Sequence, residues 1–281
     1  MTHGGIVLFL RRSVKSFGAL SSTAWPLRSG NDARGEAGAV LDAALQEHPG
    51  YGWAILRTRY AEDALEEAVR RGVRQYVIVG AGFDSFALRQ PAFARDVEVF
   101  EIDHPATQDL KRQRLRGCDV PLPRTLHFVP ADLSQEKISD ALARSTFRSA
   151  DAAFFAWLGV TQYLTREANL VTLRGIAACS ASGSTLVFTY VDQRALGTDP
   201  VTTSVGRLQG AFAAAREPWL SGFDPALLAE DLAAVGWILV EDLDGLDAKK
   251  RYCGDQRDDL LPLGPSHIVL ANVREQPALT V

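Results

Sequence analysis

Short runs of β-branched and aromatic residues recur along the chain, and most of them end at a glycine or an aspartate. A run such as Tyr76–Val79 is apolar at every position, which is typical of a strand buried on both faces of a parallel sheet. Segments of helical pattern separate these runs. This alternation predicts an α/β fold with a doubly wound, mostly parallel, seven-stranded sheet. The predicted strands are Tyr76–Val79, Val97–Ile102, Leu126–Val129, Ala152–Trp157, Thr185–Tyr190, Trp237–Glu241 and His267–Val273.

The first clear helical pattern precedes the first strand. From Tyr51 to Arg71 the apolar residues follow amphipathic spacing, and Gly72 stands in the usual C-terminal position. Residues 1–50 are interrupted by proline and glycine, so we predict an irregular, partly helical N-terminal extension and one domain over residues 51–281. The further predicted helices are Ala39–Glu47, Pro105–Arg116, Lys137–Arg144, Arg166–Ala181 and Pro225–Val235.

Composition narrows the classes of protein to consider. The chain has 281 residues, 47% of them hydrophobic and 23% charged, an ordinary balance for a soluble globular protein. Its three cysteines are widely spaced and form no C-x-x-C motif, which favours a reducing, cytoplasmic location and argues against a cysteine-based metal site. The net charge of −4 is interspersed, so we expect no nucleic-acid partner. No apolar stretch approaches the roughly 20 residues of a membrane span, and the run Ile6–Leu10 is too short for a signal peptide.

The first predicted strand runs directly into Gly80-Ala81-Gly82, and Asp84 follows. In a doubly wound sheet, ligands bind beyond the carboxyl ends of the strands. The two glycines let the backbone approach a ligand closely, and the next helix offers unpaired N–H groups at its start. Ser85 stands where a dinucleotide-binding G-x-G-x-x-G motif has its third glycine, so the loop alone is weak evidence for a nucleotide.

Acidic residues end the next two predicted strands. Glu101 and Asp103 lie about 20 residues beyond the glycines, where an acid is expected to meet ribose hydroxyls. The other interpretation of Asp103 is a solvated acid before the next helix. Asp132-Leu133 ends the third strand and suits an adenine site, with the acid accepting from the exocyclic amine and the leucine packing on the ring. Asp132 could instead cap the following helix.

Several other catalytic classes lack their motifs in this sequence. There is no G-x-S-x-G hydrolase elbow, no P-loop and no H-E-x-x-H zinc motif. The histidines show no ligand spacing, so we expect no metal site. They are His3, His48, His104, His127 and His267.

A set of motifs in fixed order now points to a family. Arg57-Thr-Arg59 is followed by GVRQ, GAGFDSFALR, VFEIDHPATQDLKRQRL, FVPADL and FFAWLGVTQYLT. Together they resemble the leucine carboxyl methyltransferase-like family, and more narrowly its bacterial branch, which includes polyketide O-methyltransferases of secondary metabolism. The resemblance extends over roughly residues 51–273 and is most specific from Gly72 to Leu164. It implies a Rossmann-like class I methyltransferase that uses S-adenosyl-L-methionine.

The resemblance also implies roles for individual residues in cofactor binding. Arg57 would pair with the carboxylate of the cofactor's methionine part, with Arg59 as the nearby alternative. The ribose would lie on Asp103, with Glu101 in reserve. The remaining residues of the implied cofactor site are Gly80, Ala81, Gly82, Asp84, Asp132, Leu133 and Leu158. For Arg89 and Lys111, which also lie in family motifs, the sequence suggests only surface or helix charge.

One position departs from the carboxyl methyltransferases proper, which have a glutamate five residues before the tyrosine of WLGVTQYL. Here that position is Leu158, followed by the retained Gly159. We interpret the leucine as a feature of the bacterial branch, which puts a protein-tail substrate in doubt. Segments near the end match parts of the family that cap the pocket, and they give Trp219, Arg251 and Tyr252 as substrate candidates, although core packing is the more ordinary explanation of Trp219.

The sequence thus predicts an O-methyltransferase acting on a small-molecule acceptor, either a carboxylate or a phenol. A carboxylate is already ionised at neutral pH and needs no general base, whereas a phenol with a pKa near 10 does. Two alternatives stay open: a cofactor-binding protein without turnover, and an NAD-dependent oxidoreductase, which Ser85 and the Asp132-Leu133 pair disfavour. Sequence alone leaves a monomer and a homodimer equally open.

Overall fold

The computed structural model describes residues 51–89, 91–117, 121–196, 219–253 and 265–274. The predicted helix Ala39–Glu47 and the predicted extension over residues 1–50 lie outside these ranges, so both stay predictions. Within them, no helix is both long enough and apolar enough to cross a bilayer.

All seven predicted strands are present, with ends that shift by a few residues. The strands are β1 (Gln75–Val79), β2 (Glu98–Asp103), β3 (Leu126–Pro130), β4 (Ala153–Trp157), β5 (Thr185–Val191), β6 (Trp237–Asp244) and β7 (Ser266–Val273). They form one sheet in the order β3-β2-β1-β4-β5-β7-β6. Strand β7 runs antiparallel to β5 and β6, and the other neighbours pair in parallel. The sheet is therefore mixed, which makes the prediction of a mostly parallel sheet correct in its main part.

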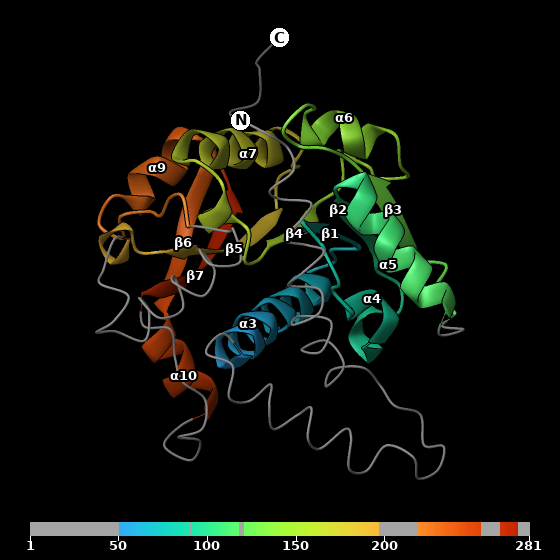
Figure 1. Cartoon of the computed structure of the whole chain (residues 1–281), viewed down its shortest axis with the longest axis horizontal. Helices are drawn as coiled ribbons and strands as arrows, with labels where there is room; N and C mark the ends of the chain where they lie inside the picture. Colours follow the sequence, from blue (N-terminus) through green and yellow to red (C-terminus); the bar gives the residue numbers. More distant parts are fainter. Residues whose placement is uncertain (1–50, 90, 118–120, 197–218, 254–264, 275–281) are drawn as a thin grey trace.

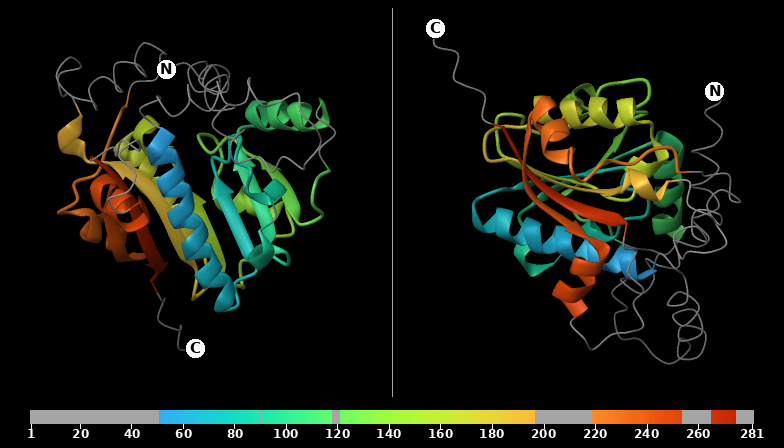
Figure 2. Two further views of the ribbon diagram at one scale, coloured as in Figure 1. Left: turned by 90° about the horizontal axis from the view of Figure 1, so that it is seen from below. Right: turned by 90° about the vertical axis from the view of Figure 1, so that its left-hand side faces the viewer.

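The helices between the strands cover both faces of the sheet. They are α3 (Tyr51–Arg70), α4 (Phe86–Arg89), α5 (Pro105–Gly117), α6 (Ile138–Ala143), α7 (Arg166–Ala178), α9 (Leu228–Ala234) and α10 (Gly245–Cys253). Figure 1 and Figure 2 show α6, α7 and α9 on one face and α3 and α10 on the other. Two differences from prediction stand out: the ranges of α4 and α10 were not predicted, and α7 ends at Ala178, before a turn through Gly183.

Two apolar cores, one on each face, hold these layers together. Successive residues of a strand point to opposite faces. In β4, Phe155 and Trp157 enter the core beneath α6, α7 and α9, while Phe154 and Ala156 enter the core against α3 and α4. All five residues of β4 are buried, which explains why the central strands read as continuous apolar runs in the sequence.

Candidate functional site

The carboxyl ends of the parallel strands meet along one edge of the sheet. Val79 pairs with Ile102, and Asp103 pairs with Pro130, so β1, β2 and β3 end in one row. Ile78 pairs with Ala156, which brings the end of β4 into the same row. This register assembles the glycine loop, the acids of β2 and the Leu158-Gly159 step, which are far apart in sequence.

The glycine loop adopts a backbone that favours glycine at two positions. Gly80 has φ +68° and Gly82 has φ +50°, both in the left-handed region. The N–H groups of Gly80 and Ala81 donate to the carbonyl of Ile102 at 2.9 and 3.1 Å, which fastens the loop to the end of β2. A Cβ on Gly80 would come within 2.8 Å of Val160 Cγ2, so this glycine also allows the segment after β4 to approach closely.

Asp103 closes the loop from the other side. Its carboxylate accepts hydrogen bonds from the backbone N–H of Gly82 and, at 2.6 Å, from that of His104. The side chain is 9% exposed, and burial raises the pKa of Asp103, although both N–H donors act in the opposite direction. The carboxylate therefore helps to shape the glycine loop, whatever else it binds.

Glu101 lies two residues before Asp103 in β2, so both side chains are on the same face of the sheet. It is 1% exposed and forms an ion pair with Lys111 of α5, with 2.6 Å between Oε2 and Nζ. Burial raises the pKa of Glu101 to about 7, while the ammonium of Lys111 lowers it. Its carboxylate thus already has a buried cationic partner, unlike an acid free to receive ribose hydroxyls.

Arg57 reaches the row of strand ends from α3. A Cβ on Gly159 would lie 2.1 Å from Arg57 Nη1 and 2.8 Å from Cζ, so the guanidinium rests directly on this glycine. Gly159 has φ +71°, and its N–H donates to Thr189 Oγ1 at 2.7 Å. Burial lowers the pKa of Arg57, whereas Tyr163 and Asp84 raise it as electrostatic neighbours. One cation therefore lies between the loop after β1 and the loop after β4.

Asp132 and Leu133 lie at the end of β3, in the same row. Asp132 Oδ1 accepts from the N–H and the hydroxyl of Ser134 at 3.0 and 2.6 Å, so this acid closes a turn after β3. Helix α6 begins later, with Lys137 at its N-cap, and the interpretation of Asp132 as its cap is wrong. The other carboxylate oxygen of Asp132 lies 4.0 Å from His104 Nε2, which connects the ends of β3 and β2. Leu133 is half-buried against the core beneath α6.

The three substrate candidates lie on the α3 side of the sheet. Trp219 and Tyr252 are half-buried against the core beneath α3. Arg251 binds Glu241 with both terminal nitrogens, at 3.0 and 2.5 Å, and Tyr60 donates to the same carboxylate at 2.6 Å. The guanidinium of Arg251 therefore ties α10 to β6 and α3.

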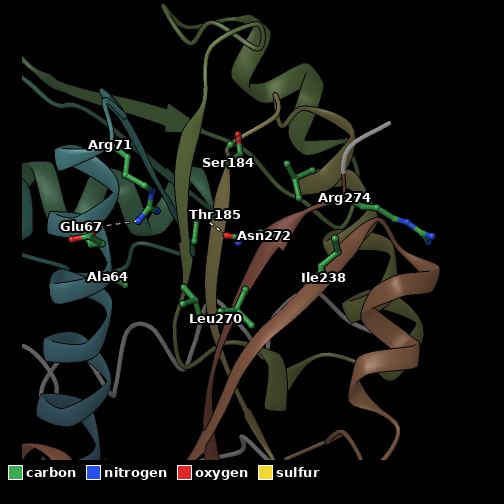
Figure 3. A pocket seen from close by; sticks show the side chains of 12 residues that line it. Ala64, Glu67, Arg71, Ser184, Thr185, Ile238, Leu270, Asn272 and Arg274 are labelled. Atoms are coloured by element: carbon green, nitrogen blue, oxygen red, sulfur yellow. Dashed lines mark hydrogen bonds and ion pairs between the residues drawn. The ribbon is translucent and has the colours of Figure 1, made fainter. Parts of the chain in front are cut away.

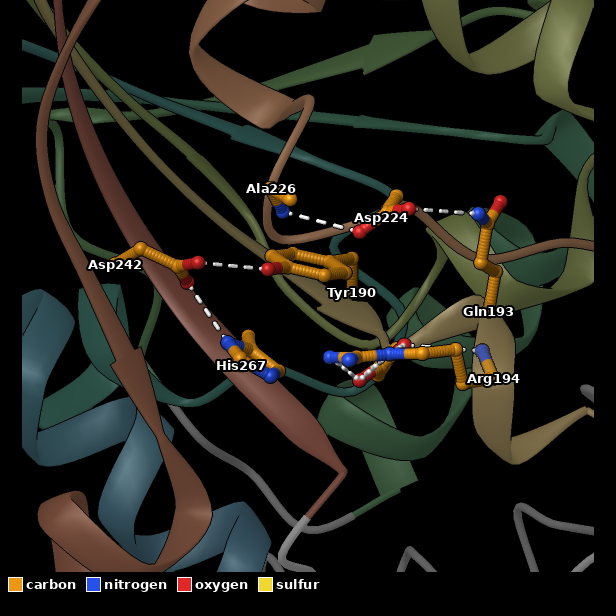
Figure 4. A network of polar contacts seen from close by, with 8 residues as sticks. Tyr190, Gln193, Arg194, Asp224, Ala226, Asp242 and His267 are labelled. Atoms are coloured by element: carbon orange, nitrogen blue, oxygen red, sulfur yellow. Dashed lines mark hydrogen bonds and ion pairs between the residues drawn. The ribbon is translucent and has the colours of Figure 1, made fainter.

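A second polar cluster lies where β5 ends and β7 begins (Figure 4). The Tyr190 hydroxyl donates to Asp242 at 2.7 Å, and His267 Nδ1 lies 2.9 Å from the other oxygen of that carboxylate. The rings of Tyr190 and His267 stack with centroids 4.6 Å apart. Burial raises the pKa of Tyr190, and Asp242 adds to the effect. Asp242 and His267 are 25 residues apart, and only the antiparallel register of β6 and β7 brings them together.

A pocket of about 620 Å³ lies elsewhere, at the opposite edge of the sheet (Figure 3). It opens between the end of α3 and the face of β6 and β7, with Arg71, Thr185, Ile238 and Leu270 among its lining residues. Thr185 begins β5, so this pocket is at the amino ends of the parallel strands. None of the predicted site residues lines it. Among the described residues, no group of three or more potential metal ligands occurs.

Sequence reasoning missed Lys111, for which it suggested only surface or helix charge. Its side chain is 3% exposed, and Nζ donates to the carbonyl of Asp84 at 2.7 Å as well as to Glu101. A signal was available, because Thr107 and Leu115 are four residues to either side and share the buried face of α5. Arg89 is likewise paired, with Glu62 of α3.

Comparison with known sequences and structures now defines the class. The family model for leucine carboxyl methyltransferase matches residues 23–177, more than half of the chain. YktD of Bacillus subtilis (strain 168), whose name assigns it to the S-adenosyl-L-methionine-dependent methyltransferases, is 32% identical over 217 residues, 77% of this chain and 71% of its own length. Rv3787c of Mycobacterium tuberculosis (strain H37Rv), named in the same way, is 35% identical over 154 residues, which span about half of each chain (52% and 49%).

Solved structures agree in fold. A DUF574-family protein from Streptomyces avermitilis MA-4680 superposes with a TM-score of 0.59 at 18% identity, over 87% of this chain and 93% of that one. The magnesium protoporphyrin IX methyltransferase of Synechocystis PCC 6803, solved with bound S-adenosylhomocysteine, gives 0.51 at 11% identity, over 95% and 99%. At such identities the likeness concerns the fold alone.

The fold and its relatives together identify an S-adenosyl-L-methionine-dependent methyltransferase, and the alternative of an NAD-dependent oxidoreductase is set aside. More narrowly, the chain belongs to the leucine carboxyl methyltransferase family.

Proposed function

We propose that this methyltransferase methylates an oxygen, preferably a carboxylate oxygen, of a small and largely apolar molecule. The observation that supports the site most strongly is the Arg57 guanidinium resting on Gly159, between two strand-end loops. A guanidinium can bind a carboxylate with two parallel hydrogen bonds, so this position suits the methionine carboxylate of the cofactor. In the same proposal, residues 51–281 form one catalytic domain and residues 1–50 an extension to it.

The other cofactor contacts follow from their places along the row of strand ends. Gly80, Ala81 and Gly82 would line the methionine part, where a missing or small side chain allows close approach. Asp103 would accept the ribose hydroxyls in addition to its two backbone donors. Asp132 and Leu133 would hold adenine. Glu101 would act indirectly, as the buried partner of Lys111, which contacts the glycine loop. Leu158 would form the rim of the site beside Gly159.

Replacing Asp103 with alanine is expected to weaken cofactor binding by about 1–3 kcal/mol, the usual cost of leaving polar partners unpaired. Two losses combine: the ribose acceptor, and the acceptor for the Gly82 N–H that shapes the loop. Isothermal titration with S-adenosylhomocysteine measures the change, and Asp109→Ala, at an exposed position of α5, is the matched control. Unchanged affinity in a folded Asp103→Ala variant would remove Asp103 from the site.

The proposed transfer needs no proton acceptor. A carboxylate oxygen attacks the methyl carbon in line with the S–CH₃ bond, that bond breaks, and sulfur keeps its electron pair. The products are a methyl ester and S-adenosylhomocysteine. The cofactor supplies an electrophilic methyl group, so the protein contributes mainly alignment and exclusion of water.

Two features of the site bear on the choice of acceptor. Leu158 makes the rim apolar where the carboxyl methyltransferases proper have a glutamate. Within the described part of the chain, the histidines at this edge are His104 and His267, and both face aspartates. An imidazole that faces a carboxylate through one nitrogen can still act as a base through the other, so substitution of each histidine tests the base-free transfer.

The acceptor class can be tested by pairing acids with phenols of the same ring skeleton. Each is incubated with enzyme and methyl-labelled cofactor, and leucine-ending peptides are included. We expect label in the acids, released as methanol by mild alkali, as methyl esters are. Label in the phenols that resists alkali would contradict the proposal, and so would label in the peptides alone.

The pH profile of kcat/KM gives an independent check. It should be flat on its acidic side down to about pH 5, because carboxylates stay ionised there. His104→Asn and His267→Asn should each keep this flat profile, with losses far below the about 10²–10⁴-fold that follows removal of a general base. An acidic limb near pH 7 that either substitution abolishes would overturn the base-free transfer and favour a phenolic acceptor.

A further inference from the structure

The buried ammonium of Lys111 stands between two parts of the cofactor site. It reaches from α5 to the carboxylate of Glu101 in β2 and to the backbone carbonyl of Asp84 in the glycine loop. Both side chains of the ion pair are almost fully enclosed, 3% and 1% exposed. Burying two charges costs several kcal/mol per ion before their attraction compensates, so such a pair is weak evidence for stability alone.

The geometry around the pair is asymmetric. Glu101 Oε2 binds Lys111, whereas Oε1 is buried with no hydrogen-bond partner among the described residues. The second hydrogen bond of Lys111 Nζ goes to the Asp84 carbonyl in the glycine loop, and not to Glu101 Oε1. The ammonium is therefore drawn toward Asp84, and Glu101 acts as the buried counter-charge that holds it there.

Asp84 connects Lys111 with Arg57. Its N–H donates to the Ala81 carbonyl at 2.8 Å, and its Oδ1 accepts from the Phe86 N–H at 2.7 Å, which fixes the carboxylate at the start of α4. That carboxylate is an electrostatic neighbour of Arg57. Hydrogen bonds thus lead from α5 to the glycine loop, and the Asp84 carboxylate acts on the Arg57 guanidinium of α3 through its charge.

We propose that Lys111 is a positioning residue for the cofactor: it holds the Asp84 carbonyl, and through Asp84 it keeps the Arg57 guanidinium in place for the methionine carboxylate. The inference rests on the proposed role of Arg57. It assigns Lys111 an effect on one part of the cofactor, the amino-acid end, and none on the adenosine end.

Two ligands distinguish an effect on the amino-acid end of the cofactor from an effect on its adenosine end. S-adenosylhomocysteine carries the amino-acid part, and 5′-methylthioadenosine lacks it. Lys111→Met keeps the length of the side chain and removes its charge. We expect the dissociation constant of S-adenosylhomocysteine to rise about tenfold or more, as for loss of a charged hydrogen bond, while that of 5′-methylthioadenosine changes by less than about twofold.

Matched variants distinguish positioning from general damage. Arg116→Met removes a positive charge at an exposed position of the same helix, α5, and should leave S-adenosylhomocysteine affinity within about twofold of the unchanged protein. Lys111→Met with Glu101→Gln leaves no unpaired buried charge, and it carries the test if the single variant does not fold. It should show the same selective loss. Adding Lys111→Met to Arg57→Ala should cause no further loss, because the residue that Lys111 positions is then absent.

Each other outcome overturns the inference. Equal losses for both ligands would mean that the whole loop has collapsed, and no loss would mean that Lys111 is only structural. A loss for Arg116→Met as large as that for Lys111→Met would mean that the charge of α5 matters and not the Lys111 contact with Asp84. Since no acceptor is present in these titrations, a wrong acceptor class would leave the result unchanged, and an inert Arg57→Ala would reveal a wrong assignment of Arg57.

Discussion

Replacing Arg57 with alanine is expected to raise the dissociation constant for S-adenosyl-L-methionine by about 10- to 100-fold, the range for a lost hydrogen bond between charged groups. The guanidinium rests on Gly159 beside Asp84, so its loss removes the cation nearest to the proposed methionine carboxylate. Isothermal titration measures the affinity directly. 5′-Methylthioadenosine, which lacks that carboxylate, should bind the variant about as well as it binds the unchanged protein.

Arg59→Ala is the matched control. Residues two apart on a helix point about 200° apart, so only one of the two arginines can face the strand ends. The Arg59 side chain is 66% exposed and pairs with Asp63 one turn on, at 3.0 Å. Its removal should change cofactor affinity by less than about twofold, as is usual for an exposed ion pair. A larger loss for Arg59→Ala than for Arg57→Ala would reverse the proposed assignment.

Gly159→Ala is expected to lower cofactor affinity at least as much as Arg57→Ala does. The new Cβ would lie 2.1 Å from Arg57 Nη1, so the guanidinium must leave its position. Because this atom is at the far end of a flexible side chain, the protein can yield there at modest cost in stability. The substitution therefore acts on binding more than on folding, and calorimetry beside a thermal melt separates the two effects.

Gly183→Ala controls for backbone strain. Gly183 has φ +82°, close to the +71° of Gly159, but its nearest heavy atom to an added Cβ is Ala152 Cβ at an ordinary 3.6 Å. Each alanine would be in the left-handed backbone conformation, which costs about 1–2 kcal/mol, so both variants should have similarly lowered melting temperatures. Only Gly159→Ala should lower affinity, and combining it with Arg57→Ala should add little further loss. Equal affinity losses in the two glycine variants, or additive losses in the double variant, would contradict displacement of Arg57.

The strands could be predicted well because their burial is simple. Each central strand is covered on both faces, so its apolar run is continuous and ends where the chain turns at a glycine or an acid. The glycine loop, the acids of β2 and the Asp132-Leu133 step were recognisable for the same reason. They stand directly at strand ends, where parallel strands bring their following residues together.

Helix α10 and the direction of strand β7 were harder to predict. The segment Gly245–Cys253 has only nine residues, too few to show a helical period plainly in the sequence. It packs through Ala248 in the core beneath α3 and through the ion pair of Arg251 with Glu241. The reversal of β7 leaves no mark in its composition. It depends on which neighbours, β5 and β6, accept its backbone hydrogen bonds.

The amino-acid sequence by itself determined the class of fold, the row of chemistry at the strand ends and the family, because these depend on local periodicity and on motifs in order. The tertiary structure decided which charged side chains pair with one another within the protein. It buried Lys111 against Glu101, turned Arg251 toward Glu241 and joined His267 to Asp242. Such pairings depend on distances between elements remote in the chain, and a side chain's charge alone does not disclose its partner.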